Sequence, residues 1–441
     1  MIRIVFPLSF IIASRFFGLF IILPVLSLYA SKLDGGDNDF LLGLLIGVYA
    51  LAQMILQIPF GILSDKIGRK KTLLLGLVIF IIGSFFCAIA NDIYTMIFGR
   101  ILQGSGAIGA VASALISDLI KEEQRSKAMA IMGGFIGLAF AFSMVLSPII
   151  SDKFGFSSLF WLSLIITIIC IILLYTCIPK ENKIIYQKNK IDKNLLFDKN
   201  LLLMDLTNFL QKCLMNIIFF IIPIFLINKF NFTKENLWII YTIAMIFGFL
   251  AMGLAGAIGE KKGLSKAILL FGIIFFMITY IFIFFSSFFD NNNIAFYFFV
   301  IAIFIFFIGF NLHEPIMQSC ASKFARVYER GLALGVFNAC GYAGSFVGGI
   351  LIGIFIKDFD ILAILLIFII FIWFVLLFLL KNPSDFKNIY LNLDFNLNIS
   401  KLQELKNKNT IIEFYQTSKN LVIKYDIKIT NSKYIQKYIM D

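Results

Sequence analysis

The sequence predicts an all-α polytopic membrane protein. Twelve transmembrane helices would form two bundles of six, followed by a small α+β domain of the ferredoxin-like type. Three observations lead to this fold class. The 441 residues are 60% hydrophobic and only 15% charged, whereas soluble domains are roughly 45–50% apolar and about 25% charged. The apolar residues gather into long runs, and the composition becomes polar after Leu380.

The apolar runs are long enough to cross a bilayer, because a transmembrane helix needs ~20 mostly apolar residues. Six runs lie on each side of a lysine-rich segment. They cover residues 7–30, 40–63, 72–90, 93–119, 127–150, 156–178, 201–228, 235–258, 264–286, 293–319, 330–355 and 359–380. We therefore expect an N-terminal six-helix bundle at 1–178, a cytoplasmic linker at 179–200, a C-terminal six-helix bundle at 201–380 and a cytoplasmic domain at 388–441.

The distribution of basic residues predicts the orientation of these helices. Nineteen Lys and Arg residues fall in one set of interhelical loops and five in the other. Cytoplasmic loops carry the excess of Lys and Arg. Both termini are therefore expected in the cytoplasm, with the protein in the inner membrane of a bacterium. The net charge of +12 fits lysines beside an anionic leaflet, so no nucleic-acid partner is expected.

An internal repeat supports the division into two halves. The pattern Gly-x-x-x-Asp-Lys-x-Gly at 61–68 returns as Gly-x-x-x-Glu-Lys-x-Gly at 256–263, after the second helix of each half. The stretches RSKAMAIMGG from Arg125 and RGLALGVFNA from Arg330 are a second pair. Parallel repeats of six helices are a known membrane architecture.

The region after residue 387 has the pattern of a small α+β domain. NIYLNLDF alternates apolar and polar residues as a half-buried strand does. NISKLQELKN has Ile399, Leu402 and Leu405 on one helical face. TIIEFYQ and NLVIKYDI follow as two strands of a hairpin, and NSKYIQKYIMD closes as a helix. The predicted order is β-α-β-β-α.

Several classes of site are excluded by what the chain lacks. The six cysteines fall in apolar spans without a CxxC pair, and His313 is the single histidine, so no metal site or disulfide framework is expected. No GxxxxGK[ST] loop occurs, which excludes direct ATP use by that motif. No nucleophile–base pair stands out in the spans. We expect no enzyme activity and no cofactor.

Polar side chains inside the spans are the candidate functional residues. Glu314 is the candidate proton-coupling acid, because a buried carboxyl group can exchange a proton near neutral pH. Lys212 is its candidate partner, and His313 is its neighbour in sequence. The alternative is a fixed ion pair, or a residue at the cytoplasmic mouth. Asp205 lies nearer the inner end of its helix and is interpreted as interfacial.

A set of uncharged polar residues could line a path through the bundle, although the alternative for each is helix packing. Tyr49, Gln53 and Gln57 share one helical face because of their spacing. The candidate path residues are Tyr49, Gln53, Gln57, Gln103, Asn208, Asn311 and Asn338.

The loop GILSDKIGRKK resembles the signature loop of the major facilitator superfamily. The matching residues are Gly61, Leu63, Asp65, Lys66, Gly68, Arg69 and Lys70. The resemblance implies a conformational latch made by Gly61, Asp65, Lys66, Gly68, Arg69 and Lys70, with Asp65 meeting a helix of the other half. The alternative is a plain turn held inside by its basic residues. Asp118 and Arg125 are candidate partners of Arg69 and Lys70.

A second match is GRILQGSGA at 99–107, which resembles the arginine motif of the same family. Arg100, Gln103, Gly104 and Gly106 are in place. An arginine in a span costs ~2.5–3.5 kcal/mol on insertion scales, so it should face a cavity or a partner. The resemblance implies a role in proton transfer, and the alternative is a structural arginine bonded to backbone carbonyls.

The whole chain resembles the YajR-type branch of drug-efflux-like transporters in this family. SRFFGLFIILPVL, with Arg15, Gly18 and Pro24, NLHEP at 311–315 and the cytoplasmic tail carry this resemblance. One departure is SPIISD from Ser147, where antiporters of the family tend to have Gly-Pro-x-x-Gly-Gly.

The function that these resemblances imply is secondary active transport. We expect proton-coupled export of a small, amphiphilic compound by alternating access, by a monomer in contact with the lipid bilayer. Two alternatives stay open: nutrient uptake or facilitated diffusion on the same fold, and a membrane sensor that signals through the C-terminal domain.

Overall fold

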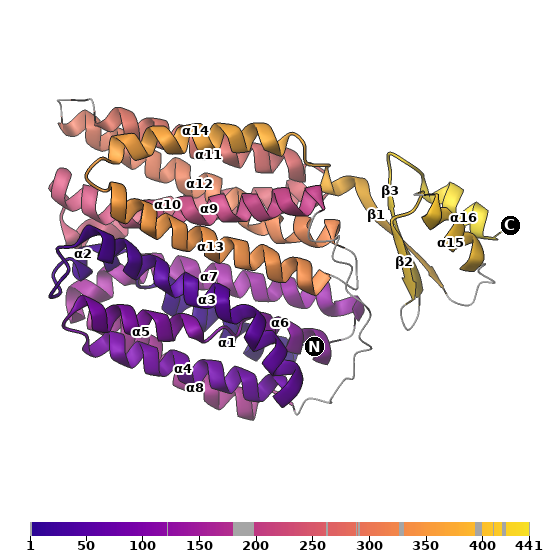
Figure 1. Cartoon of the computed structure of the whole chain (residues 1–441), viewed down its shortest axis with the longest axis horizontal. Coiled ribbons are helices and arrows are strands. Elements are labelled where there is room, and N and C mark those ends of the chain that lie inside the picture. Colours follow the sequence, from indigo (N-terminus) through magenta and orange to yellow (C-terminus); the bar gives the residue numbers. More distant parts are fainter. Residues whose placement is uncertain are drawn as a thin grey trace.

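The computed structural model confirms the predicted fold class: a long helical bundle followed by a small sheet with two helices (Figure 1). The structure describes residues 2–120, 122–179, 198–261, 263–287, 289, 292–325, 330–392, 399–408, 410–416 and 420–440. The predicted linker 179–200 lies mostly outside these residues. The side chains of Arg125, Glu260 and Lys261 also lie outside the described part.

The first half of the bundle contains the helices before the linker. They are α1 (Ile2–Phe20), α2 (Leu26–Ala30), α3 (Asp39–Ile67), α4 (Arg69–Ile89), α5 (Ile93–Ser105), α6 (Gly109–Leu119), α7 (Glu122–Phe154) and α8 (Ser157–Thr176). The predicted run 7–30 is divided into α1 and α2. The run 93–119 is divided into α5 and α6, because the helix is interrupted at residues 106–108.

The second half repeats the pattern with fewer interruptions. Its helices are α9 (Lys199–Ile224), the π-helix η2 (Phe225–Lys229), the 3₁₀-helix η3 (Lys234–Asn236), α10 (Leu237–Lys261), α11 (Ser265–Ser286), α12 (Asn292–Phe324), α13 (Arg330–Phe355) and α14 (Phe359–Leu377). Ten helices in the described residues are long and apolar enough to cross a membrane. The divided segments α1–α2 and α5–α6 occupy the remaining two predicted positions.

The C-terminal residues form a small unit with the predicted order β-α-β-β-α. Its elements are η5 (Pro383–Asp385), β1 (Phe386–Asn392), α15 (Ile399–Asn407), β2 (Glu413–Gln416), β3 (Asn420–Asp426) and α16 (Ser432–Met440). The strand order is β1-β3-β2, and both pairs are antiparallel. This is the split β-α-β arrangement of ferredoxin-like folds. Ile389, Leu402, Ile423 and Ile435 belong to its core.

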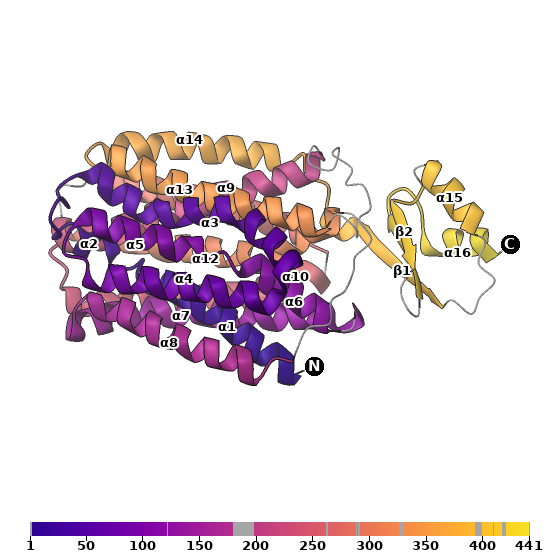
Figure 2. The ribbon, with the colours of Figure 1, turned by 60° about the horizontal axis from the view of Figure 1, so that its bottom comes forward.

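The sheet of the C-terminal unit faces the bundle, and its two helices lie on the far side (Figures 1 and 2). Lys424 of β3 donates to the Ala325 carbonyl oxygen at the end of α12, with a distance of 2.7 Å. A cation at this position suits the negative end of a helix dipole. The Asn382 amide donates to the Gly263 carbonyl in the loop between α10 and α11 at 3.0 Å. The unit is therefore attached to the second half.

The two halves touch at the end of the bundle remote from the termini, which we call the outer end. A Cβ atom at Gly43 of α3 would lie 2.3 Å from the Gly349 carbonyl oxygen of α13. The Ser27 hydroxyl donates to the Phe220 carbonyl at 3.1 Å, and so also links the halves. Direct backbone contact of this kind requires residues without side chains.

The opposite end, which carries both termini, is called the inner end. At the boundary between the halves, glycines on the inner parts of α3, α7, α10 and α13 face open space. A Cβ atom would meet nothing within 4 Å at Gly61, Gly133, Gly134, Gly253, Gly256 and Gly335. In this structure the halves are therefore closed together at the outer end and stand apart at the inner end.

Candidate functional site

Two groups of charged side chains lie inside the bundle, one in each half. The first half contains Arg15 of α1 and Arg100 of α5, which are 2% and 0% exposed. The second half contains Lys212 of α9 and Glu314 of α12. All four side chains were candidates in the sequence. The structure adds which side chains each of them contacts.

Arg100 is held beneath Tyr49 by glycines that bring three helices together. A Cβ atom at Gly104 would lie 2.2 Å from the Tyr49 carbonyl oxygen. A Cβ atom at Gly83 of α4 would lie 2.4 Å from the Gln103 backbone nitrogen. Because α5 packs so closely on α3 and α4, the Arg100 guanidinium lies 4.7 Å from the centre of the Tyr49 ring.

A short chain of hydrogen bonds fixes one side of Arg100. Its Nη1 atom donates to Gln103 Oε1 at 2.9 Å, and Gln103 Nε2 donates to the Ser84 hydroxyl at 2.9 Å. The Nε and Nη2 atoms of Arg100 have no hydrogen-bond partner in the described part of the chain. The hydrogen bond of Arg100 in this part of the chain goes to the Gln103 side chain and not to a backbone carbonyl.

Arg15 reaches the same tyrosine from the other side. Its Nη2 atom donates to Gln53 Oε1 of α3, and its guanidinium carbon lies 5.9 Å from the centre of the Tyr49 ring. Its Nε atom has no partner among the described residues. Tyr342 of α13 interacts with Arg15 and Gln53. A residue of the second half thus completes the arginine cluster, which we define as Arg15, Arg100, Tyr49, Gln53 and Tyr342.

The second half holds an ion pair instead. Lys212 Nζ donates to Glu314 Oε1, and the same nitrogen lies 4.9 Å from the centre of the Phe310 ring. The two side chains are 24% and 36% exposed. The pair is therefore partly accessible, whereas the arginine cluster is enclosed.

His313 points away from this ion pair. Its Nε2 atom lies 2.8 Å from the Leu269 carbonyl oxygen of α11, and its ring is fully buried. The ring stands edge-on to Phe276 and Trp373. Adjacent residues on a helix point in different directions, and the His313 ring is packed between helices α11, α12 and α14.

Several candidate path residues make hydrogen bonds either to a second helix or within their own helix. The Asn208 amide donates to the Phe337 carbonyl of α13 at 2.7 Å, and the Asn311 amide donates to the Phe307 carbonyl at 2.8 Å. Gln57 accepts from Gln53 at 3.3 Å. Asn338 is half-buried on α13. For Asn208 and Asn311 the packing interpretation fits these contacts.

The charged loop between α3 and α4 makes its described contacts within the first half. Asp65 lies 2.6 Å from Arg69, and Arg69 Nε donates to Asp118 Oδ2 of α6 at 3.2 Å. The pairing of Arg69 with Asp118 was expected. Lys70 donates to the Ile178 carbonyl at 2.6 Å. Gly68 has φ +101°, a backbone conformation that favours glycine.

Among the described residues, the ion pair of Asp65 lies within the first half. Its side chain is 64% exposed, and its ion pair is with Arg69, four residues further along the chain. Lys66 is also exposed. This arrangement agrees with the separation of the halves at the inner end, since a latch between halves would be open there.

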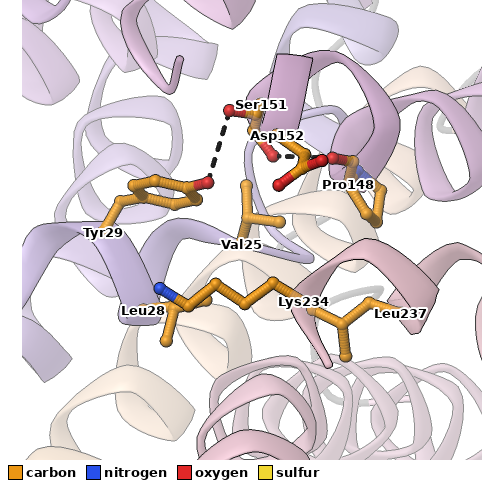
Figure 3. Close-up of a pocket in the computed structure, with 8 residues that line it drawn as sticks. All are labelled: Val25, Leu28, Tyr29, Pro148, Ser151, Asp152, Lys234 and Leu237. Atoms are coloured by element: carbon orange, nitrogen blue, oxygen red, sulfur yellow. Dashed lines mark hydrogen bonds between the residues drawn. The ribbon is translucent and has the colours of Figure 1, made fainter. Parts of the chain in front are cut away.

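A small pocket at the outer end lies where the halves meet (Figure 3). Tyr29 of α2 donates to the Ser151 carbonyl of α7 at 3.3 Å. The Nζ atom of Lys234, in η3 of the second half, lies 5.9 Å from the centre of the Tyr29 ring, and that of Lys32 lies 5.6 Å from it. Asp152 also lines this pocket. We interpret it as part of the outer closure.

Two residues acquire interest only from the structure. Tyr342 stands among small residues in GYAG, and nothing in that pattern indicates its contact with Arg15. Asp205 is 9% exposed, and no ion pair to it is found in the residues that the structure describes. Its early position in the helix suggested an interfacial residue. Burial by neighbouring helices could not be read from the sequence.

No group of three or more His, Cys, Asp or Glu side chains suited to a metal ion occurs among the described residues. The free cysteines in this part of the chain are Cys87, Cys170, Cys177, Cys213, Cys320 and Cys340.

Comparison with known proteins agrees with this architecture. A family model described as Major Facilitator Superfamily matches residues 8–349 and, in a second match, 204–416. An uncharacterized transporter of Buchnera aphidicola subsp. Acyrthosiphon pisum is 37% identical over 344 residues, which cover 76% of this chain and 85% of that protein. The inner membrane transport protein YajR of Escherichia coli (strain K12) is 33% identical over 357 residues, which cover 80% of this chain and 77% of YajR.

Among solved structures, a crystal structure of a D-xylose-proton symporter superposes with a TM-score of 0.68. The superposition covers 86% of this chain and 98% of the symporter, at 14% sequence identity. At this identity the similarity concerns the fold alone. The resemblance of the C-terminal unit to the tail of one branch of transporters stays a prediction.

Proposed function

Because the chain belongs to the major facilitator superfamily, we propose that it is a proton-coupled secondary transporter that exports a small amphiphilic compound by alternating access. Transport of a small molecule across a membrane is what the family and the named relatives have in common. Proton coupling and export are our proposals. The single observation that carries the coupling is the Lys212–Glu314 ion pair inside the bundle.

The orientation follows from the basic loops. With the Lys- and Arg-rich loops in the cytoplasm, the inner end and both termini face the cytoplasm of a bacterium. The state described here, closed at the outer end and parted at the inner end, would then be open toward the cytoplasm. Rocking of one half against the other about a central site would give the opposite state.

The ion pair provides a chemical basis for coupling. A deprotonated Glu314 attracts Lys212, whereas a protonated Glu314 is neutral and retains only a weaker hydrogen bond. Charges inside a membrane protein interact more strongly than in water. Proton binding would therefore release Lys212 and loosen the contact between α9 and α12. A proton from one side of the membrane could in this way change the relative stability of the two states.

The loop between α3 and α4 is proposed to act as the latch of the other state. Here Arg69 pairs with Asp65 and Asp118 in the first half. Closing the inner end would bring Asp65 toward the second half, where a carboxylate suits a helix N-terminus. The latch residues are Gly61, Asp65, Lys66, Gly68, Arg69 and Lys70.

Proton flux in proteoliposomes tests the proposal. The wild type, Glu314→Gln and the matched surface variant Glu404→Gln are compared while a panel of cationic, neutral and anionic amphiphiles and small metabolites is added. We expect substrate-driven proton movement in the wild type and in Glu404→Gln, and its loss in Glu314→Gln. Substrate movement without proton flux, unchanged in Glu314→Gln, would make the protein a facilitator and Glu314 a structural residue.

The same vesicles distinguish the alternatives. Accumulation of substrate on the side from which protons enter the transporter indicates exchange, and hence export. Accumulation on the side to which protons move indicates uptake. A sensor would move no compound in the panel, and its C-terminal unit would instead bind a partner.

A further inference from the structure

The arginine cluster carries two positive charges, and neither arginine has a carboxylate partner among the residues that the structure describes. The described acidic side chains of the first half all lie near helix ends or in loops, far along the chain from the centre of their spans. They are Asp34, Asp37, Asp39, Asp92 and Asp152 at the outer end, and Asp65 and Asp118 at the inner end. Arg15 and Arg100, by contrast, are enclosed within the bundle.

Hydrogen bonding within the cluster is also incomplete. Three guanidinium nitrogens have no partner among the described residues: Nε of Arg15, and Nε and Nη2 of Arg100. Both side chains are more than nine-tenths buried. The face of the Tyr49 ring lies near both guanidinium groups. This cation–π contact lowers the electrostatic energy of the two cations. It does not provide a hydrogen-bond acceptor for the three unpartnered nitrogens. An acceptor with negative charge would bind these nitrogens and balance the two cations.

We propose that Arg15 and Arg100 bind the acidic group of the transported compound, so that the substrate carries a carboxylate or a similar oxyanion. The planar fork of a guanidinium matches the two oxygens of such a group. Tyr49, between the two arginines, would contact an apolar part of the same molecule. This inference rests on the proposed transport function, and it names the substrate class.

The second half controls access to the cluster. Tyr342 lies on α13 and interacts with Arg15 and Gln53. The same helix closes the outer end through Gly349, against Gly43 of α3. When the halves separate at the outer end, Tyr342 must move away with α13. The arginines would then become accessible from the outer side, and a bound acid could leave or enter there.

The test measures binding to the full-length protein in lipid nanodiscs without a proton gradient. The probes are two matched series: 4-phenylbutyrate, 4-phenylbutanamide and 4-phenylbutylamine, and 2-naphthoate, 2-naphthamide and 2-naphthylmethylamine. Each series keeps the apolar part and changes the charge from negative to neutral to positive. We expect the acids alone to raise the melting temperature, by about 2 °C or more at saturation.

Variants assign this binding to the cluster. Arg15→Gln and Arg100→Gln should each weaken acid binding about tenfold or more, because a charged hydrogen-bond partner is lost. Lys153→Gln, which removes an exposed positive charge at the outer end of α7, should leave it unchanged. If either glutamine variant does not elute as a folded monodisperse protein, Arg15→Lys and Arg100→Lys replace it. These keep the charge and should retain a weakened preference for the acids.

Three results would overturn the inference: equal stabilisation by amides or amines, an acid effect that survives in both arginine variants, or no stabilisation by either acid. In those cases ordered water or proton transfer would account for the arginines. The result is separable from the coupling proposal, since binding is measured without a gradient. Loss of proton flux in Glu314→Gln together with absent acid binding would refute the substrate class alone.

Discussion

The contact between α3 and α13 at Gly43 should determine how firmly the outer end is closed. A Cβ atom there would lie 2.3 Å from the Gly349 carbonyl oxygen and 2.7 Å from the Gly353 Cα atom, where ordinary contacts begin at 3.4 Å. Gly43→Ala therefore requires the two helices to separate by about 1.1 Å, the difference between 3.4 and 2.3 Å. Both obstacles are backbone atoms, so no side-chain rotation can relieve the clash.

The free-energy penalty falls on one state only. Overpacking of this kind costs roughly 1–3 kcal/mol. The clash disappears when the outer end opens, so the variant should shift the equilibrium toward the outer-open state by about 5- to 150-fold. A ligand-free protein whose outer end is normally closed would then populate the outer-closed and the outer-open state in measurable amounts.

The matched control lies on the same helix. A Cβ atom at Gly61 would meet nothing within 4 Å in this structure, so Gly61→Ala should leave the outer end closed. The opening is measured by electron–electron double resonance, as the distance between spin labels at the exposed outer positions Asp37 and Asp358. We expect a longer-distance population in Gly43→Ala and not in Gly61→Ala. An unchanged distribution in Gly43→Ala, or an equal shift in both variants, would refute the reasoning.

Three further predictions concern other parts of the chain. Lys424→Met removes the donor to the Ala325 carbonyl and a charged partner of buried Glu413. The C-terminal unit should therefore be destabilised by about 3 kcal/mol or more and be cleaved faster by a protease. An unchanged rate of cleavage would contradict the attachment of this unit to the bundle through Lys424. The Asp92 carboxylate accepts a hydrogen bond from the Thr95 hydroxyl, which lowers the pKa of Asp92 below its usual 3.8. The stabilisation by this carboxylate is complete above pH 3.8 and is lost as the pH falls through the lowered pKa. Asp92→Asn should therefore reduce the loss of melting temperature on acidification. Asp205→Asn should displace the pH dependence of transport, because a buried carboxyl group can exchange a proton near neutral pH. A pH profile equal to that of the wild type would contradict this role of Asp205.

The architecture could be predicted from the sequence because the bilayer imposes it residue by residue. An apolar run of ~20 residues has few alternatives to a transmembrane helix. The order of the C-terminal elements was also predictable, because alternation in NIYLNLDF and the helical face of NISKLQELKN are local patterns. The breaks inside the first and fourth predicted spans were not predicted, since their apolar composition continues without interruption through 21–25 and 106–108.

The candidate site was predictable as a set of residues but not as a set of contacts. The sequence placed Lys212 and Glu314 in the predicted spans 201–228 and 293–319, and the structure joins them. Helix geometry indicated that His313 and Glu314 point apart, but not that α11 and α14 enclose the histidine. The spacing of residues along one helix shows which side chains share a face. It does not show which neighbouring helix that face contacts, because the rotation of the helix about its axis depends on its neighbours.

The sequence by itself determined that the chain spans a membrane in two related halves, and which few polar residues must avoid lipid. Only the tertiary structure decided that Arg15 and Arg100 share Tyr49 without an acid, that Tyr342 reaches them from the other half, and that the outer end is the closed one. The physical reason is the range of the interactions. Transfer into lipid acts on each residue separately, whereas a contact between helices is a property of two surfaces distant in the chain.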